Sequence, residues 1–306
     1  MSAEIENGTR LNAIKSNVNY KNISKYIWSI VRAVFILGIS YIILKPLLIK
    51  IVSSIRTPED VLDPTVIWIP KDLNFRNYVI AFKAMDYPHA FLNSFSLTLL
   101  LSSLQLIVCT LIGYGFGRFQ VKGNNFFFGL VIFTLIVPPQ MIFIPMYLNF
   151  RFFDVFGLIP GGGINLLGTY WTGVLLALTG MGIKNGLFIY IMRQFFKGMP
   201  QALEEAAYVD GAGPFKTFYR IMLPGAIPAL VVVFLFAFVW QWNDYFFTTM
   251  FFGGKNLLTN TLNGIVDTLV ARGVIKHPNV SILGYIIKNT GSLMFLAPLI
   301  ILYSFL

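Results

Sequence analysis

The sequence predicts an all-α, polytopic membrane protein with about six transmembrane helices, and two observations lead to this prediction. Of the 306 residues, 56% are hydrophobic and only 12% are charged, and the mean hydropathy is +0.71. A soluble domain usually carries about a quarter charged residues. The apolar residues also occur in long runs, and a run of roughly 18 or more residues with few charges is typical of a membrane-spanning helix.

Six such runs can be delimited along the chain. In order, the predicted spans are Ile27–Val52, Phe91–Gly113, Phe126–Tyr147, Trp171–Met192, Ala229–Phe251 and Ser281–Leu306. Residues 1–26 form a polar segment before the first span, and residues 27–306 form the predicted transmembrane domain. Pro and Gly interrupt several spans, and in lipid such breaks usually face other helices or a water-filled cavity.

The distribution of basic residues predicts that the N-terminus is cytoplasmic. The basic residues that precede the first span are Arg10, Lys15, Lys21 and Lys25. Cytoplasmic segments carry an excess of Lys and Arg, and the loops after the second and fourth spans fit this rule. The loop after the fifth span is an exception. The formal net charge of +10 is therefore attributed to membrane orientation rather than to nucleic-acid binding, because the basic residues form no stripe with interleaved aromatics.

Residue types that carry chemistry are scarce. The two histidines have no metal-ligand spacing around them, and the single cysteine, Cys109, lies inside an apolar run and is interpreted as a small buried residue. No glycine-rich phosphate loop followed by Lys-Ser or Lys-Thr is present. We therefore predict a chain without catalytic residues, bound metal or bound cofactor.

The loop of residues 199–224, between the fourth and fifth spans, is the most informative segment and is called the docking segment below. Pro200 suits the first position of a short helix, where its missing N–H costs nothing. Glu204 and Glu205 then fall early in that helix, where the dipole favours carboxylates. Gly211 can adopt the left-handed conformation that ends it.

A second short helix is expected to follow this glycine. Pro214 would open it, and it must end near Leu223 because Pro224 follows. Two short helices meeting at a glycine elbow on the cytoplasmic side could transmit the motion of a soluble partner. From composition alone, a membrane-surface connector is an equally good interpretation.

A family resemblance distinguishes these interpretations. Glu205-Ala206-Ala207, Gly211, Ile221 and Leu223-Pro224 resemble, at their usual spacing, the EAA motif of bacterial ABC-importer permeases. The resemblance implies a type I ABC-importer permease fold in which this loop is the coupling helix that sits in a cleft of an ATP-binding subunit. The residues expected to couple to the ATPase are Glu204, Glu205, Ala206, Ala207, Tyr208, Asp210, Gly211, Phe215, Ile221, Leu223 and Pro224.

Other segments are similar to one group of these permeases. They are Trp68-Ile69-Pro70-Lys71, Asn77-Tyr78, Phe91-Leu92-Asn93-Ser94, Arg193-Gln194-Phe195-Phe196 and Trp242-Asn243-Asp244-Tyr245. The group is the smaller permease subunits of maltose-type oligosaccharide importers. The resemblance implies a homologous second permease, an ABC ATPase dimer that binds ATP and magnesium, and an extracytoplasmic solute-binding protein. It also implies a location in the cell membrane of a prokaryote.

A sugar path needs apolar faces to stack on rings and polar groups to bond hydroxyls. The candidates toward the outer half of the fifth span are Trp240, Trp242, Asn243, Asp244 and Tyr245, and Asn93 is a weaker one. An interfacial aromatic belt and helix-packing polar groups are the alternatives.

Lys184 lies about ten residues from the cytoplasmic end of its span, roughly 15 Å at the helical rise. A cation at that depth is usually functional or paired. If Lys184 faces the translocation path, its counter-charge would be Asp244 or an anionic sugar such as a uronide. The alternative is that the side chain snorkels to the membrane surface or forms a structural pair.

Two other function classes compete with the permease. One is a proton-coupled secondary transporter that uses Asp244 as its relay, which would leave the docking segment unexplained. The other is a membrane-embedded enzyme, for which a catalytic cluster is missing. The dependence of transport on ATP or on a proton gradient distinguishes the first alternative.

Overall fold

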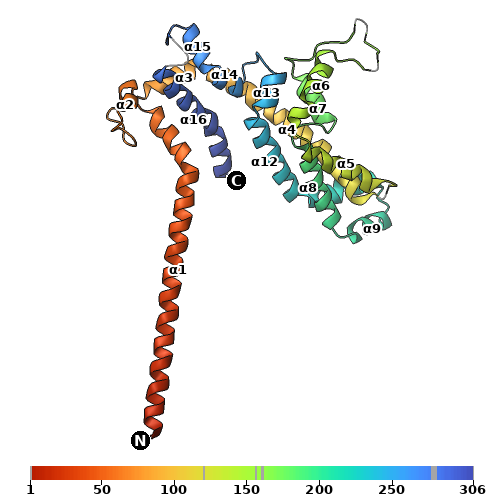
Figure 1. Cartoon of the computed structure of the whole chain (residues 1–306). Coiled ribbons are helices and arrows are strands. Elements are labelled where there is room, and N and C mark those ends of the chain that lie inside the picture. The colour runs from red at the N-terminus through yellow and green to blue at the C-terminus, as the bar shows by residue number, and fades with distance from the viewer. Residues whose placement is uncertain (1, 120, 156, 160–161, 277–280, 306) are drawn as a thin grey trace. The chain divides into compact units, whose positions relative to one another are not determined.

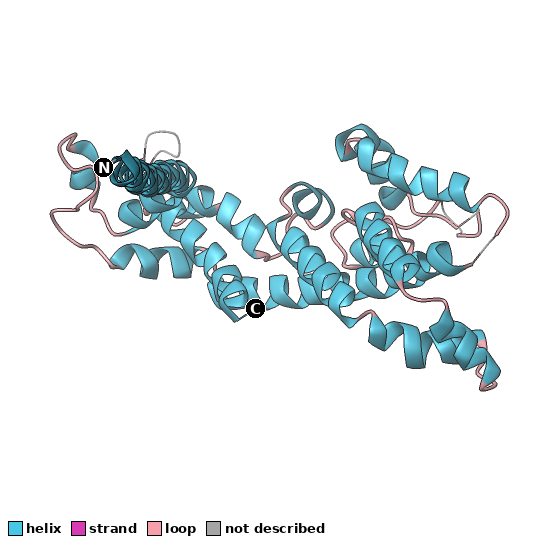
Figure 2. Ribbon diagram, turned by 90° about the horizontal axis from the view of Figure 1, so that it is seen from below, coloured by secondary structure: helices cyan, strands magenta, loops and turns pink. Residues whose placement is uncertain are grey.

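The computed structural model describes residues 2–119, 121–155, 157–159, 162–276 and 281–305, with side chains from residue 23 to residue 304 within these ranges. These residues form helices and loops (Figure 2), with one isolated β-bridge between Phe153 and Ile164. The predicted all-α class is confirmed.

The chain forms two compact units, Met1–Asn77 and Tyr78–Leu306. In chain order the helices are α1 (Ser2–Ser54), α2 (Pro58–Leu62), α3 (Arg76–Ala84), α4 (Tyr87–Arg118), α5 (Asn124–Ile136), α6 (Pro139–Arg151), α7 (Trp171–Leu178), α8 (Asn185–Gly198), α9 (Ala202–Val209), α10 (Pro214–Thr217), the π-helical turn η1 (Phe218–Met222), α11 (Leu223–Gly225), α12 (Ile227–Asn243), α13 (Phe246–Phe251), α14 (Leu258–Asn263), α15 (Ile265–Ala271) and α16 (Ile282–Phe305).

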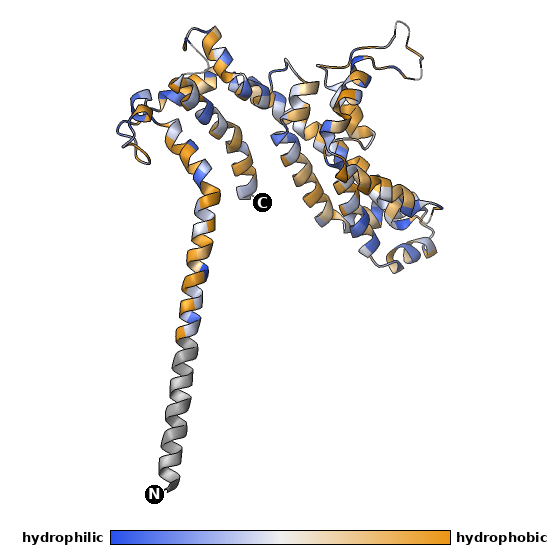
Figure 3. Cartoon of the chain, viewed as in Figure 1, coloured by the Kyte–Doolittle hydropathy of each residue, from blue (hydrophilic) through white to orange (hydrophobic). Residues whose placement is uncertain are grey.

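Helix α1 dominates the first unit (Figure 1). Its stretch Ile23–Ser54 has a mean hydropathy of 2.2 and is long enough to cross a membrane. Hydrophobic residues predominate along it from residue 23 onward (Figure 3). The most apolar part of this stretch has no buried residues. Such a helix needs an apolar surrounding, either lipid or other membrane helices.

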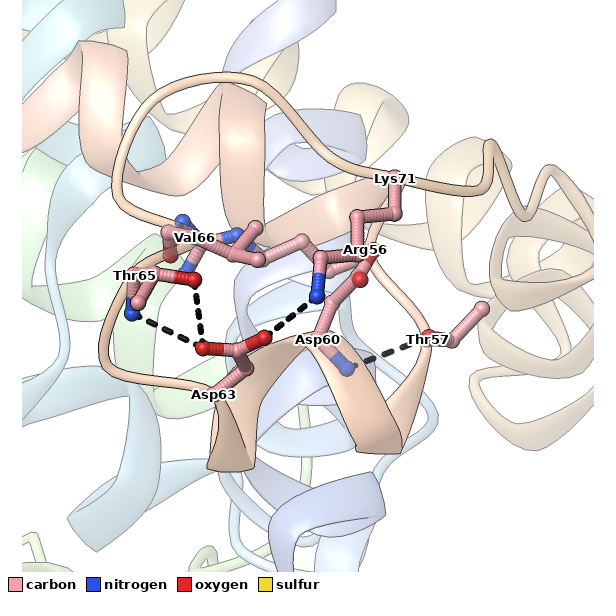
Figure 4. Close-up of polar contacts among 7 residues, drawn as sticks. All are labelled: Arg56, Thr57, Asp60, Asp63, Thr65, Val66 and Lys71. Carbon is pink, nitrogen blue, oxygen red and sulfur yellow. Dashed lines mark hydrogen bonds and ion pairs between the residues drawn. The ribbon is translucent and has the colours of Figure 1, made fainter.

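The loop after α1 is closed by its own polar contacts (Figure 4). The Arg56 guanidinium donates to the carbonyl oxygens of Val66 and Ile67. The fully buried Asn77 side chain donates from Nδ2 to the carbonyls of Ser54 and Arg56, at 2.9 Å each. These bonds fix the return of the chain after the first span.

In the second unit, α4 packs along α8, α12 and α7. Figure 1 shows α5, α8 and α9 near one end of α4, and α14, α15 and α16 near the other. Two glycines of α4 allow the close approach of α8. A Cβ at Gly113 would lie 2.5 Å from Met192 Cβ, and one at Gly117 would lie 3.2 Å from the Arg193 carbonyl oxygen. Because real Cβ atoms essentially never come within 3.0 Å of another heavy atom, Gly113 is required at this crossing.

Three of the predicted spans are confirmed as continuous helices. Among the described residues, the helices long and apolar enough to cross a membrane are Ile23–Ser54, Tyr87–Arg118 and Ile282–Ser304. Two bent pairs raise the number to five if each pair is one span. The polytopic character is therefore supported, although the number of continuous spans is smaller than predicted.

The remaining predicted spans are broken. The predicted span Phe126–Tyr147 is a pair of helices bent by 101°, and it bends where Pro138 cannot continue a helix. The prediction of one helix over Trp171–Met192 is wrong, because α7 ends at Leu178 and α8 begins at Asn185. The predicted span Ala229–Phe251 is likewise interrupted after α12, where Asp244 separates it from α13.

Candidate functional site

The elbow predicted in the docking segment is present. Helix α9 carries Glu204 and Glu205 in its first turn and ends before Gly211, which adopts φ +76°. The Ala212 amide then donates back to the Ala207 carbonyl at 2.9 Å, as in a helix ended by a left-handed glycine. The expectation that Pro200 is the first helical residue is wrong by two residues. Helix α9 starts at Ala202, because a turn through Pro200 precedes it.

The second helix of the docking segment starts as predicted, and its helical run ends at Gly225, two residues beyond the predicted Leu223 and with Pro224 inside it. Pro214 occupies the first position of α10. The chain continues through the π-helical turn η1 and into α11, which contains Pro224. A proline within a helix removes one backbone hydrogen bond. The π-helical turn that precedes Pro224 has the wider i→i+5 hydrogen-bond pattern in place of the α-helical one. The chain then bends by 75° into α12.

Glu204 ties α9 to the end of α4. Its Oε1 accepts a hydrogen bond of 2.9 Å from the Tyr114 hydroxyl, and its Oε2 lies 3.5 Å from Arg118 Nε. The ion pair is nearly enclosed, with side-chain exposures of 6% for Arg118 and 13% for Glu204. Arg118 also donates to the Met199 carbonyl at 2.8 Å. One arginine therefore holds both the start of the docking segment and the first turn of α9.

An aromatic cluster continues this attachment. The Tyr114 ring lies 5.2 Å from the ring of Phe196 in α8 and 4.6 Å from that of Phe218 in η1, measured between centroids. Met222 and Ala226 are fully buried in the same core. A displacement of the docking segment would therefore be passed to α4 and α8 through packed side chains.

The opposite face of the elbow is exposed and apolar. Val209 is 87% exposed, Phe215 is 86% exposed and Tyr219 is 68% exposed. Of the predicted coupling residues, Ala207 is buried, Glu204, Ile221 and Leu223 are half-buried, and Glu205, Ala206, Tyr208, Asp210, Gly211, Phe215 and Pro224 are exposed. Large apolar side chains on a protruding elbow are typical of a surface that a partner covers.

The break between α7 and α8 forms a second candidate site. The backbone turns at Gly180 (φ +75°) and at Lys184 (φ +60°), and Lys184 immediately precedes α8. A cavity of about 310 Å³ opens here, called the break cavity below. Its walls come from the bend between α5 and α6, from residues 180–186 and from Phe247. Lys184 and Asn185 both line it.

The structure brings Lys184 together with one of the predicted path residues. Its Nζ lies 5.6 Å from the centre of the Trp240 ring, which stacks at 5.8 Å on Phe188. A cation over an aromatic face is favourable. The side chain of Lys184 is exposed. In the parts of the chain that the structure describes, no ion pair joins Lys184 to a carboxylate.

The other predicted path residues are mostly engaged elsewhere. Trp242 is buried and donates to the Phe295 carbonyl at 3.3 Å, and Asn243 bonds within its own helix. Asp244 accepts from the amides of Phe247 and Thr248 and thereby caps α13. Asn93 donates to the Asn256 carbonyl at 3.0 Å. Tyr245 is 56% exposed.

Residues outside the predicted set also belong to these sites. Tyr114 and Arg118 were not predicted as site residues, although their i, i+4 spacing places them on one helix face. Asn185 was also missed, although it is a polar residue next to the only lysine of its apolar run. Within the described ranges, no group of three or more His, Cys, Asp and Glu side chains could hold a metal ion.

Comparisons with known proteins cover most of the chain. The sequence model of the family described as "Binding-protein-dependent transport system inner membrane component" matches residues 109–306. The osmoprotective compounds uptake permease protein GgtD of Synechocystis sp. is 32% identical over 72% of this chain and 71% of its own length. The arabinooligosaccharides transport system permease protein AraQ of Bacillus subtilis is 26% identical over 91% of each chain.

The fold is also similar to that of a solved structure. It is a chain from a bacterial ABC transporter involved in the import of the acidic polysaccharide alginate. The match has a TM-score of 0.68 and covers 92% of this chain and 95% of that chain, at 22% sequence identity. At this identity the similarity concerns the fold alone.

Proposed function

The chain belongs to the family of binding-protein-dependent transport system inner membrane components, the permease subunits of ABC importers, and we propose that it forms half of the translocation path for a carbohydrate. The proposal of a carbohydrate rests on the similarity to AraQ over 91% of both chains. The segments around Trp68, Asn93 and Trp242, which resemble oligosaccharide-importer permeases, support it further.

The single observation that supports ATPase coupling is the shape of the docking segment. Its exposed face, with Val209, Phe215 and Tyr219, offers apolar anchors to a soluble partner. Its inner face is joined to α4 by Glu204 and Arg118. We therefore assign the predicted coupling residues, Glu205 and Gly211 among them, to contact with or support of an ATP-binding subunit.

The mechanism that follows is alternating access. Closure of two ATPase subunits around ATP and magnesium would displace the docking segment, and the packed contacts of Tyr114 and Phe218 would carry this displacement to α4 and α8. The pathway between this chain and a homologous second permease would then open to the opposite side. A solute-binding protein would deliver the sugar outside the cell, and the N-terminus of this chain would lie in the cytoplasm.

Co-purification tests the coupling assignment. The tagged chain, expressed in cells that carry its partner subunits, should bring down an ATPase, and Phe215→Asp should reduce the recovered ATPase activity at least about tenfold by placing a charge in an apolar contact. Phe75→Asp is the matched control, because Phe75 is also exposed, at 62%, but lies in the loop before α3. Equal recovery from Phe215→Asp and wild type would contradict the assignment.

The energy source separates this function from the proton-coupled alternative. Uptake should stop when ATP is depleted and should continue when the proton gradient alone is collapsed. The structure favours ATP, because Asp244 uses both carboxylate oxygens to cap α13 and is less suited to relay protons.

A further inference from the structure

The break cavity contains a lysine that the fold does not explain. A residue other than glycine at φ +60° is strained, because its Cβ approaches the following carbonyl oxygen. A cation just before the first turn of α8 is also disfavoured by the positive end of the helix dipole. At this position a glycine would relieve the strain of the positive φ, and a carboxylate or hydroxyl side chain would interact more favourably with the N-terminus of α8.

Lys184 also has no ion-pair partner among the described residues. Asp244, the partner considered from the sequence, is engaged as the cap of α13. Across the described ranges, the ion pairs that form are Lys71–Asp63, His89–Asp86 and Arg118–Glu204, and none involves Lys184. The Trp240 ring beneath the ammonium group favours a cation at this place but does not neutralise it.

Asn185 provides a second, independent observation. Its side chain lines the same cavity and is only 2% exposed, yet both its Oδ1 and its Nδ2 lack a hydrogen-bond partner among the described residues. A buried amide left without partners costs free energy. The geometry around it is tight, since a Cβ on Gly182 would lie 3.3 Å from Asn185 Nδ2. The amide therefore lies at the cavity wall with its hydrogen-bonding capacity unused among the described residues.

These features converge on an anion. Lys184 and Asn185 both line the cavity and α8 begins at Asn185, so a cationic residue, an amide donor and the positive end of a helix dipole lie at one wall. The remaining walls, with Phe133, Met146 and Phe247, are apolar and suited to the faces of a sugar ring. A volume of about 310 Å³ is at the small end of the usual range for ligand pockets.

We propose that the break cavity is a subsite for the carboxylate of an acidic sugar, so that the importer carries a uronate-containing rather than a neutral oligosaccharide. This inference rests on the proposed function. Lys184 would pair with the carboxylate, Asn185 would donate to it from Nδ2, and its Oδ1 would accept from a neighbouring hydroxyl group.

The test is equilibrium binding to the purified importer complex in phosphatidylcholine nanodiscs, without the solute-binding protein. The probes are digalacturonate and the neutral galactose disaccharide. The wild-type complex should bind digalacturonate about tenfold more tightly than the neutral sugar, which is the scale expected for one charge-assisted contact. In Lys184→Gly this ratio should fall to about one, and in Lys184→Arg it should be largely retained.

The choice of Lys184→Gly separates binding from folding. Because glycine suits the positive φ, the thermal stability of this variant should equal or exceed that of wild type while its selectivity is lost. Lys255→Met is the matched control, since Lys255 also lies over an aromatic ring, 5.5 Å from the centre of Tyr170, and should keep the wild-type ratio.

The outcomes distinguish this inference from the proposed function. If the complex retains its ATPase but binds both sugars equally, or binds neither, the acidic subsite is wrong and the permease assignment stands. If no ATPase accompanies the wild-type chain, the proposed function itself fails. A Lys255→Met complex that loses selectivity as Lys184→Gly does would also overturn the subsite, because the effect would then follow net charge.

Discussion

The docking segment and the break cavity each place a charged side chain against aromatic rings, but they treat the charge in opposite ways. Glu204 in the docking segment accepts from Tyr114 and pairs with Arg118, so its carboxylate is satisfied within the chain. Lys184 in the break cavity has a ring below it and no ion pair among the described residues. The adjacent Asn185 amide is equally unpartnered in that part of the chain.

The difference indicates two roles for buried polarity. The Glu204 carboxylate is paired on both oxygens, by a hydrogen bond and by an ion pair, and a charge held in this way fixes one arrangement of helices, which is what a segment that transmits motion requires. Unsatisfied groups such as those of Asn185 are costly unless something else pairs with them. The charges of Glu204 and Arg118 therefore compensate each other within the chain, whereas neither polar atom of the Asn185 side chain has a partner among the described residues.

The largest effect is expected from disrupting the helix crossing on which the docking segment rests. Gly113→Leu would insert a side chain where even a Cβ lies 2.5 Å from Met192 Cβ. We expect a loss of about 3 kcal/mol, at the upper end for overpacking, seen as poor accumulation and a much lower melting temperature in detergent. Gly129→Leu is the control, because nothing lies within 4 Å of a Cβ there. Similar melting temperatures for the two variants would show that α4 and α8 are not rigidly apposed.

A double-mutant cycle tests whether Glu204 and Arg118 act as one unit. Either Glu204→Gln or Arg118→Gln leaves the remaining charge nearly enclosed without its partner, whereas the double variant removes both charges. We expect a coupling energy of about 2 kcal/mol and a double variant more stable than Arg118→Gln alone. Thermal unfolding and ATP-driven uptake of the four proteins measure it. Additive effects would mean that the inner face of the docking segment is no more organised than the break cavity.

Much of the docking segment follows from local rules, which explains why it could be predicted. The position of Gly211 and the start at Pro214 depend only on neighbouring backbone geometry. The pairing of Glu204 with Arg118 joins residues 86 positions apart, and no sequence pattern shows which helix ends meet. The long spans α1, α4 and α16 were predictable because hydropathy alone defines them.

The break cavity was not predictable by the same means. Residues 171–192 read as one apolar run, and hydropathy does not distinguish a continuous helix from two short ones. Gly180 and Gly182 indicated an interruption, but the left-handed conformation of Lys184 did not follow from its residue type. The segment before Lys184 also contacts a residue far away in the sequence, because Gln105 Nε2 donates to the Ile183 carbonyl at 3.4 Å and leaves no room for a Cβ at Gly182.

A smaller effect should follow from the elbow itself. Gly211 has φ +76° and nothing would lie within 4 Å of a Cβ added there, so Gly211→Ala would add only backbone strain. We expect a cost of about 1 kcal/mol, measured as roughly fivefold lower hydrogen-exchange protection across α9. Gly213→Ala is the control, because Gly213 has φ −75° and equally open surroundings. If both variants lose the same protection, the left-handed turn is not what shapes the elbow.

The smallest effect is expected from an exposed ion pair in the first unit, which contrasts with the enclosed pair of Glu204. Lys71 and Thr65 both donate to Asp63 (Figure 4). The hydrogen bond from Lys71, followed by those from Thr65, holds the pKa of the Asp63 carboxyl well below its usual range. A carboxyl whose folded-state pKa is lowered stabilises the loop above its unfolded pKa of about 3.9 and loses this effect only as the pH falls through the lowered value.

The pair should therefore behave identically at pH 8 and pH 5. Asp63→Asn should reduce hydrogen-exchange protection of residues 63–71 by the same small factor at both pH values, after correction for intrinsic exchange. Asp72→Asn, at an exposed position one residue beyond Lys71, should change nothing at either pH. Because exposed pairs contribute little and are screened by salt, the difference should also shrink at high ionic strength. A difference that disappeared already at pH 5 would mean that the Asp63 carboxyl is not held in its charged form by Lys71. The nearly enclosed Glu204 pair would then be the better organised of the two.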